Sequence, residues 1–250
     1  MNFLGTNTVH NYVLQVLDEL KNSDDPTMLI EAEGLDTLKL TKGYLLEATI
    51  KAHKDAPSIL LDGVKGAAGT DYSVDWTTNG DGSAIIKMQK KTLRVVSLKA
   101  EDSPVVVSEY YSEDSAIGRM QSNEHIRGTY DDPKLIIKKV WATDRQPEFV
   151  YYSAKDTSTT FDLEYIPYPS LATLSVEPAA YSLVDGSITE NIPTINPDII
   201  GGDEPYVMIS DKLEFAVLNL VAAMVLDSLS LHDKAAIYKT KYQEYLQTAR

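Results

Sequence analysis

The sequence predicts an α+β protein, in which helices from both ends of the chain form one bundle around an inserted antiparallel β-sandwich or barrel-like domain. Apolar residues recur at helical spacing near both termini, while the middle consists of short β-branched and aromatic segments between turn residues. An acidic, proline-rich stretch before the last helices predicts an extended arm. The predicted parts are N-terminal helices at 1–62, the β-domain at 70–170, the acidic arm at 171–207 and a C-terminal helical hairpin at 208–250.

Two helices are predicted in the N-terminal part. Apolar residues spaced by three and one predict an inward-facing stripe over 9–20, which Asn7 or Thr8 can cap. A second helix is predicted over 41–56, because its small and aliphatic residues share one face. Pro57 ends it, since the residue before a proline avoids the helical conformation.

Seven short segments, rich in β-branched and aromatic residues, follow a glycine-rich connection at 63–69. Turn residues such as those at 79–82 separate them. This spacing predicts a small antiparallel sandwich or barrel. The predicted strands are 72–76, 84–89, 92–98, 105–111, 135–140, 149–153 and 160–166.

The predicted arm is strongly one-sided in charge. From Asp156 to Asp211 the chain carries ten carboxylates and no Lys or Arg. We interpret residues 171–207 as an extended acidic arm with a short strand or turn inside it; a plain surface loop is the alternative. Loops of this length in compact domains usually serve a function or are ordered by a partner.

The C-terminal part is predicted to be a helical hairpin. Asp211 and Glu214 fit a capping pattern, and the segment that follows is apolar nearly all round, as in a central helix. A short turn at 231–233 leads into a final helix that carries tyrosines and, on its outer side, lysines.

Composition excludes several functions. The formal net charge of −14 argues against a broad basic face that grips nucleic acid. The absence of cysteine excludes disulfides, thiolate metal sites and cysteine nucleophiles, and only four histidines are present. The N-terminus lacks the features of a signal peptide, and the most apolar window, 215–226, is shorter than the ~20 residues that span a bilayer. We therefore expect a protein made in the cytoplasm, with no membrane partner.

No catalytic or cofactor motif is present. The glycines at 63–69 lack the lysine of a phosphate-binding loop, and 77–88 lacks the acids of a calcium loop. There is no nucleophile elbow and no His-Glu-x-x-His sequence. We expect no cofactor, metal or enzymatic activity, although folding can bring two carboxylates together.

A basic segment precedes the middle of the β-domain. It contains no acid between Gly82 and Ala100. Such a segment can contact phosphates, but we interpret it as an ion-pair partner of the acidic arm in the same or a neighbouring subunit. Its residues are Lys87, Lys90, Lys91, Arg94 and Lys99.

The C-terminal run from Ile209 to Leu229, followed by 234–246, resembles the closing hairpin of tailed-phage head-to-tail adaptor proteins, the group that includes tail tubular protein A of short-tailed phages. Segments 92–98, 128–137 and 161–169 look like the β-domain strands of those adaptors. The predicted arm is longer than expected for that group, and is compatible with a ring protein of a more elaborate short tail, such as those of crAss-like phages.

The resemblance implies a structural virion protein. Such adaptors form a ring, usually of twelve copies, beneath the portal; they join the capsid to the tail and let genomic DNA pass during ejection without specific binding. It further implies that the hairpin faces the portal, while the β-domain and arm face neighbouring subunits or the next tail ring.

The candidate assembly residues are cations and tyrosines on these parts. Two other classes of function stay open: another phage tail or neck component, and a carbohydrate- or peptide-binding module or unrecognised hydrolase. The count of 15 tyrosines suits an interface or a sugar-binding surface equally. The candidates are Lys234, Lys239, Lys241, Tyr242, Tyr245 and Arg250 on the hairpin, with Lys90 and Lys91 in the β-domain.

Overall fold

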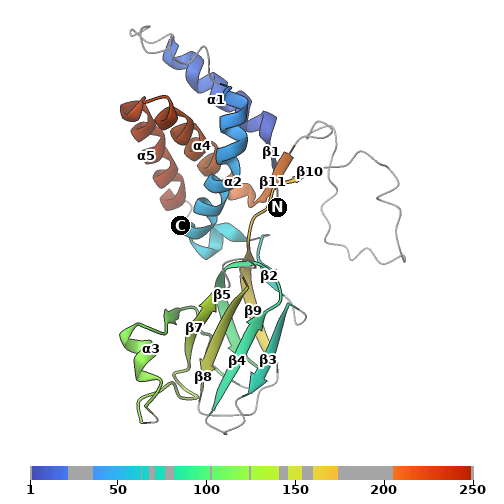
Figure 1. Cartoon of the computed structure of the whole chain (residues 1–250), viewed down its shortest axis with the longest axis vertical. Helices are drawn as coiled ribbons and strands as arrows, with labels where there is room; N and C mark the ends of the chain where they lie inside the picture. The colour runs from blue at the N-terminus through green and yellow to red at the C-terminus, as the bar shows by residue number, and fades with distance from the viewer. Residues whose placement is uncertain are drawn as a thin grey trace, which may run out of the picture. The chain divides into compact units, whose positions relative to one another are not determined.

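The protein is α+β, as predicted, and divides into two compact units (Figure 1). Met1–Val64 and Pro169–Arg250 form the helical unit, and Lys65–Tyr168 form the β unit. The computed structural model describes residues 2–21, 36–62, 64–67, 71–76, 82–101, 103–123, 125–140, 146–153, 160–173 and 205–248.

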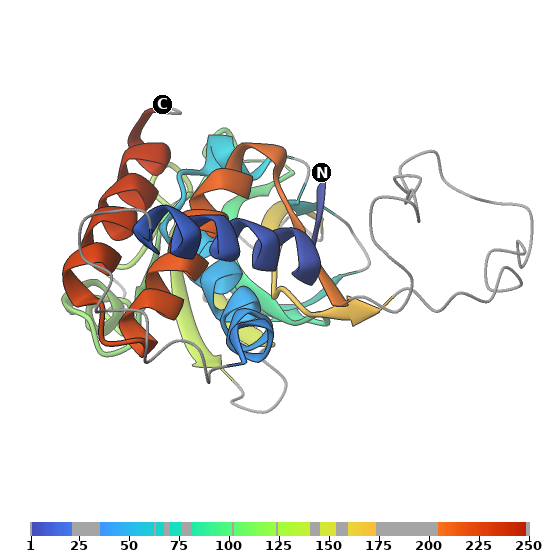
Figure 2. The same cartoon turned by 90° about the horizontal axis from the view of Figure 1, so that it is seen from above.

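The helical unit is built around one apolar helix. Every residue of α4 from Ala216 to Ala223 is buried, because α1, α2 and α5 all pack against it. Figure 2 shows α1, in dark blue, running across the other helices of this unit. The helices are α1 (Thr6–Lys21), α2 (Thr37–Asp55), α4 (Glu214–Ser228) and α5 (His232–Thr248), with the 3-10 turns η3 (Ser58–Leu61) and η5 (Asp211–Leu213).

The two predicted N-terminal helices are confirmed, but their first residues differ. The α1 helix starts at Thr6, directly after a strand, so Asn7 and Thr8 lie inside its first turn. The α2 helix starts at Thr37, where the side chain of Asp36 accepts a hydrogen bond from the Lys39 amide at 3.0 Å. This cap satisfies an amide that the helix itself cannot pair.

The start of the first hairpin helix differs from the predicted capping pattern. Asp211 is not its N-cap, since η5 precedes α4 and the residue at the N-cap position of α4 is Leu213. Neither η5 nor α4 has a side-chain hydrogen bond at its cap. The 3-10 turn tightens the chain at this point and takes the place of the cap.

A small sheet completes the helical unit. Its strand order is β1-β11-β10, with β1 at Asn2–Gly5, β11 at Pro205–Ile209 and β10 at Ala172–Thr173. Val207 and Ile209 on β11 are buried, and Leu4 of β1 is buried opposite Val207. The sequence did not predict β1, and it assigned residues 205–207 to the arm. The part of the predicted arm between β10 and β11, residues 174–204, lies outside the described residues.

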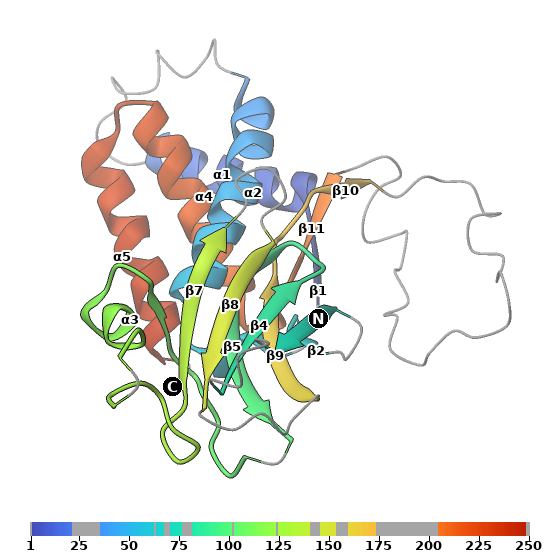
Figure 3. The same ribbon diagram turned by 60° about the horizontal axis from the view of Figure 1, so that its bottom comes forward.

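The β unit contains two sheets, and no barrel closes among its described residues. Figure 3 shows β7, β8 and β4 side by side in the larger sheet. The larger sheet has the order β3-β4-β8-β7-β6, with bounds Tyr72–Trp76, Ser83–Met88, Pro147–Tyr152, Lys134–Val140 and Tyr110–Ser112. The smaller has the order β2-β9-β5, with bounds Gly66–Ala67, Phe161–Pro167 and Thr92–Ala100.

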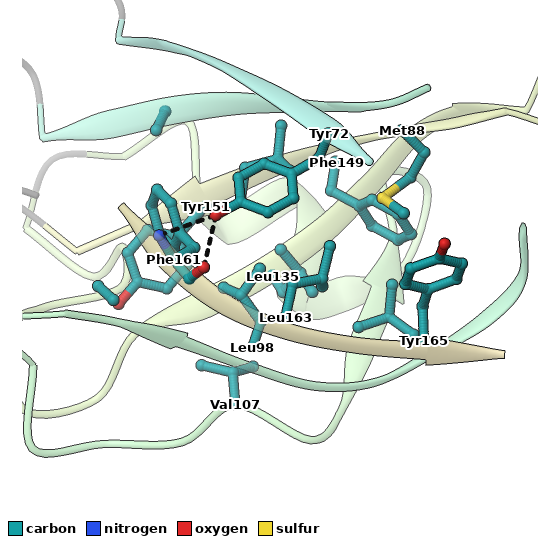
Figure 4. Close-up of a cluster of buried hydrophobic side chains, with 14 residues drawn as sticks. Tyr72, Met88, Leu98, Val107, Leu135, Phe149, Tyr151, Phe161, Leu163 and Tyr165 are labelled. Atoms are coloured by element: carbon teal, nitrogen blue, oxygen red, sulfur yellow. Dashed lines mark hydrogen bonds between the residues drawn. The ribbon is translucent and has the colours of Figure 1, made fainter. Parts of the chain in front are cut away.

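The two sheets share one hydrophobic core (Figure 4). Tyr151 of β8 and Phe161 of β9 meet edge to face, with ring centroids 5.2 Å apart. The hydroxyl of Tyr72 donates to the Phe161 carbonyl at 2.5 Å and accepts from the Phe161 amide at 3.1 Å. Tyr72 of β3 therefore makes two hydrogen bonds to the first residue of β9, while its ring stays in the core.

The predicted strand at 105–111 is confirmed only at its last two residues, Tyr110 and Tyr111. Val107 makes an isolated bridge to Leu98, and the strand that forms is β6, which runs parallel to β7. Parallel neighbours need a long crossover connection; here it spans residues 113–133 and contains α3 (Ala116–Met120). Gln121 holds this connection together: its side chain donates to the Ile117 carbonyl at 2.8 Å and accepts from the Gly128 amide at 2.8 Å.

Candidate assembly surface

The α5 helix has one buried face and one exposed face. Its buried face carries Tyr238, Tyr242 and Leu246, which are spaced by four residues. Ile237 and Tyr245 lie on the exposed face and are 50% and 42% exposed. Large apolar side chains that are exposed together on one face can mark a site of protein–protein interaction.

An aromatic pair extends this face onto α4. Phe215, which is 56% exposed, stacks on Tyr245 with ring centroids 5.8 Å apart and ring planes 14° apart. The amino group of Lys241 lies 4.4 Å from the centroid of the Tyr238 ring, which fixes its stem along the helix surface. We call Phe215, Ile237, Lys241 and Tyr245 the hairpin patch.

Tyr242 does not belong to the hairpin patch, although it was a candidate. It is 1% exposed, and its hydroxyl donates to Asp55 of α2 at 2.8 Å. Burial, together with the Asp55 carboxylate, raises the pKa of Tyr242 well above its usual value. Asp55 is also paired with Lys51 at 3.0 Å, so Tyr242 joins two helices inside the unit.

The candidate lysines of the hairpin lie in different environments. Lys239 is paired with Asp227 at 2.5 Å, and the ring of His232 lies 3.2 Å from the same carboxylate. The hydrogen bond from Lys239, against the opposing effect of burial, lowers the pKa of Asp227, and His232 adds to the lowering. Lys234 is half-buried, whereas Arg250 lies outside the described residues.

Two cations of the basic segment are paired with acids of the same unit. Lys90 is paired with Asp71 at 2.9 Å, and Lys87 with Asp75 at 2.8 Å. Lys91 is exposed. The carboxylate that Lys90 meets is therefore not part of the predicted arm, and the basic segment is more nearly neutral than its sequence suggests.

Sequence reasoning missed Phe215, because it placed this residue among those that fill a buried helix. Its position in the first turn of the predicted helix was the available signal. The next turn contains a buried polar contact: Tyr12 of α1 donates to the Asn219 side chain at 3.0 Å, and Asn219 donates to the Phe215 carbonyl at 2.7 Å. Burial, with smaller contributions from nearby Tyr and Glu side chains, raises the pKa of Tyr12 to about 12.

The described residues contain no group of three or more His, Asp or Glu side chains placed to hold a metal ion. None of the helices in the described part of the chain has the length and apolarity needed to cross a membrane. No protein-family model, curated protein or solved structure matches this chain.

Proposed function

We propose that this chain is a structural protein of a tailed bacteriophage that forms a ring beneath the portal and joins the capsid to the tail. We infer an assembly role without enzymatic activity, in which genomic DNA passes through an acidic channel that repels the phosphate backbone. Portal protein, neighbouring copies of the chain and the next tail ring are its proposed partners.

The organisation of the chain supports the proposal. Helices from both ends form one unit, and a β unit with two sheets around a common core is inserted between them. We interpret the β unit as a sandwich, and residues 171–207 as an acidic arm whose last residues enter β11. This is the order of parts on which the resemblance to head-to-tail adaptors rests.

The observation that carries the proposal is the hairpin patch. The stacked pair of Phe215 and Tyr245 leaves two aromatic rings about half exposed, and Ile237 is exposed on the same helix as Tyr245. Aromatic side chains are enriched where protein interfaces concentrate their binding energy. In the proposed ring, this patch is the part of the hairpin that contacts the portal.

The test is binding to purified portal rings, measured by native mass spectrometry or light scattering. Wild-type protein is expected to form a ring-sized complex that gives the copy number directly. The double substitution Phe215→Ser and Tyr245→Ser is expected to weaken binding by about tenfold or more, since loss of an interface anchor costs about 2 kcal/mol. Tyr242→Phe is the matched control, because the side chain is buried and should leave portal binding unchanged.

Point substitutions are a cleaner test than removal of α5. A chain truncated after Asp233 loses Tyr238, Tyr242 and Leu246 from the core and is expected to unfold the helical unit. If the wild-type protein is folded but does not bind portal rings, the connector proposal is contradicted. Binding to a different tail ring would instead identify another neck component, and binding to a glycan or peptide would identify a binding module.

A further inference from the structure

The exposed face of α2 begins with two neighbouring lysines. Lys39 and Lys42 are both exposed and are spaced by three residues, so their charges are adjacent on the helix surface and repel each other. Within the described part of the chain neither amino group forms an ion pair, whereas Lys51 further along α2 does. The cap residue Asp36 bonds to the backbone amide of Lys39, and the first acid inside α2 is Glu47. The start of this face is therefore positive in a chain whose net charge is −14.

The same face contains a glycine whose missing side chain relieves no clash. Gly43 follows Lys42 inside α2, where a glycine weakens a helix relative to alanine. No atom lies within 4 Å of the position that its Cβ would occupy. Leu46, one turn further along, is half-buried. The glycine therefore leaves room on the helix surface, beside an apolar side chain, for another backbone to approach closely.

The chain itself contains an acidic segment that such a face could accept. Residues 174–204 carry six carboxylates and no Lys or Arg. The sequence suggested the basic segment of the β unit as their partner, but Lys87 and Lys90 there are paired with acids of their own unit. Two copies of net charge −14 repel each other over most of their surface, so a contact between copies needs a place where opposite charges meet. The six acids are Glu177, Asp185, Glu190, Asp198, Asp203 and Glu204.

We infer that the α2 face, defined by Lys39, Lys42, Gly43 and Leu46, binds the acidic segment 174–204 of a second copy of this chain. The two lysines pair with its carboxylates, and the glycine lets its backbone lie close to the helix. The binding face and the bound segment are different parts of the chain, so the contact is heterologous. Each copy then offers its α2 face to one neighbour and its acidic segment to another. Such contacts close into a ring when the rotation between copies permits it.

This contact is separate from the hairpin patch. It gives the proposed ring its contact between neighbouring subunits, and to that extent it rests on the proposed function, whereas the hairpin patch contacts the portal. Self-association through the α2 face can nevertheless be measured without any portal protein.

The first experiment identifies the partner of the two lysines. Full-length chain labelled with nitrogen-15 is mixed with unlabelled chain, with and without portal rings, and treated with a carbodiimide, which joins an amine to a carboxylate in direct contact. We expect mass spectrometry to find Lys39 or Lys42 linked to a carboxylate of 174–204 on a chain of the other isotope. Links that occur only within one chain, or that join these lysines to other segments of a neighbour, would overturn the inference.

The second experiment measures self-association of the full chain by sedimentation velocity over a range of concentrations. Lys42→Glu is expected to weaken self-association by about tenfold, because it places a carboxylate against the acidic segment. Arg119→Glu is the matched control: Arg119 is an exposed cation on α3 of the β unit, and the substitution changes the net charge equally. An equal loss in both variants would show that net charge alone controls association, and the α2 face would have no special role.

Gly43→Leu distinguishes the contact from a structural role of the glycine. The new side chain enters open space, and leucine is a better helix former than glycine, so the free energy of unfolding is not expected to fall. Self-association is expected to weaken by about tenfold or more, because the side chain holds the bound segment away from the helix. A folded variant that associates like the wild type would contradict the close approach at this position.

The outcomes separate this inference from the proposed function. A wild-type chain that stays monomeric in every condition, portal rings included, overturns the inference. If Lys42→Glu and Gly43→Leu still form rings on the portal, the connector proposal stands and this contact fails. If the chain self-associates through the α2 face but does not bind portal rings, the contact stands and the connector proposal fails.

Discussion

At the scale of single residues, Asp71 shows how the β unit holds a buried charge. Its carboxylate accepts a hydrogen bond from Tyr165 at 2.6 Å and is paired with Lys90 at 2.9 Å. Burial alone would raise the pKa of Asp71, but the hydrogen bond from Tyr165 and the charge of Lys90 outweigh it and leave the pKa below its usual value. The ionised form is therefore the one that the fold stabilises.

The substitution Asp71→Asn is expected to lower the free energy of unfolding at pH 7 by about 1–3 kcal/mol, because it removes one partner of a buried, charge-assisted pair. The pKa of Asp71 is lower in the folded protein than in the unfolded chain. Its stabilisation is thus fully present above the ordinary value of 3.8 and is lost as the pH falls through the folded value. Urea unfolding at pH 7 and pH 3 should show the difference between wild type and variant shrinking in acid.

The control for this prediction is Asp75→Asn. Asp75 pairs with Lys87 at 2.8 Å, but both side chains are largely exposed, and exposed ion pairs contribute about 0–1 kcal/mol. A loss of stability as large as that of Asp71→Asn would show that burial of the carboxylate is not the cause.

Single residues also mark a limit of sequence reasoning. Helical spacing indicates that Tyr238, Tyr242 and Tyr245 lie on a helix, but a tyrosine suits both a core and a surface. Tyr242 is buried, and its hydroxyl donates to Asp55, a residue far away in the sequence. Lys90 is similar, since its partner Asp71 is brought to it by the fold and not by any motif.

At the scale of elements, two glycines have opposite roles. A Cβ at Gly66 of β2 would lie 2.4 Å from the Tyr165 ring, so only glycine lets this strand pair closely with β9. Gly43, inside α2, has no atom within 4 Å of the same position. There the missing side chain only adds conformational entropy to the unfolded chain.

Gly66→Ala is expected to destabilise the β unit by about 1–3 kcal/mol, as overpacking does in other cores. Gly43→Ala is expected to stabilise the helical unit by about 0.5–1 kcal/mol. Thermal or chemical unfolding of the two variants measures both effects. Shifts of the same sign in the two variants would contradict this explanation.

Local patterns predicted the helices better than the sheets. The apolar stripe of α1 and the all-round apolarity of α4 are periodic within one segment, so the sequence alone indicates them. The β1 strand and the parallel pairing of β6 with β7 depend on partners that are distant in the chain. A four-residue strand has no periodicity of its own that could reveal it.

At the scale of the whole molecule, charge and exposed apolar surface are distributed unevenly. Two of the five cations in the basic segment of the β unit, Lys87 and Lys90, are paired with acids of the same unit. The hairpin patch lies in the helical unit. We therefore expect the helical unit to make the main assembly contacts.

We expect high pH to destabilise the helical unit before the β unit. Burial is the main cause that raises the pKa of Tyr12, Tyr238 and Tyr242 above the usual 10.0. The β unit contains one buried counterpart, Tyr165, and the exposed Tyr111. Above pH 10 the unfolded chain releases phenolic protons that the folded protein retains, so the free energy of unfolding falls as the pH rises.

Tyr242→Phe isolates one of these groups. At pH 7 it is expected to cost about 0.5–1.5 kcal/mol through the lost hydrogen bond to Asp55. Above pH 10 the variant should lose stability less steeply than the wild type, because its unfolded chain has one phenol fewer to ionise. Denaturation followed by helical circular dichroism from pH 8 to pH 12 measures both slopes. Parallel slopes would show that Tyr242 is not held neutral by its burial against Asp55.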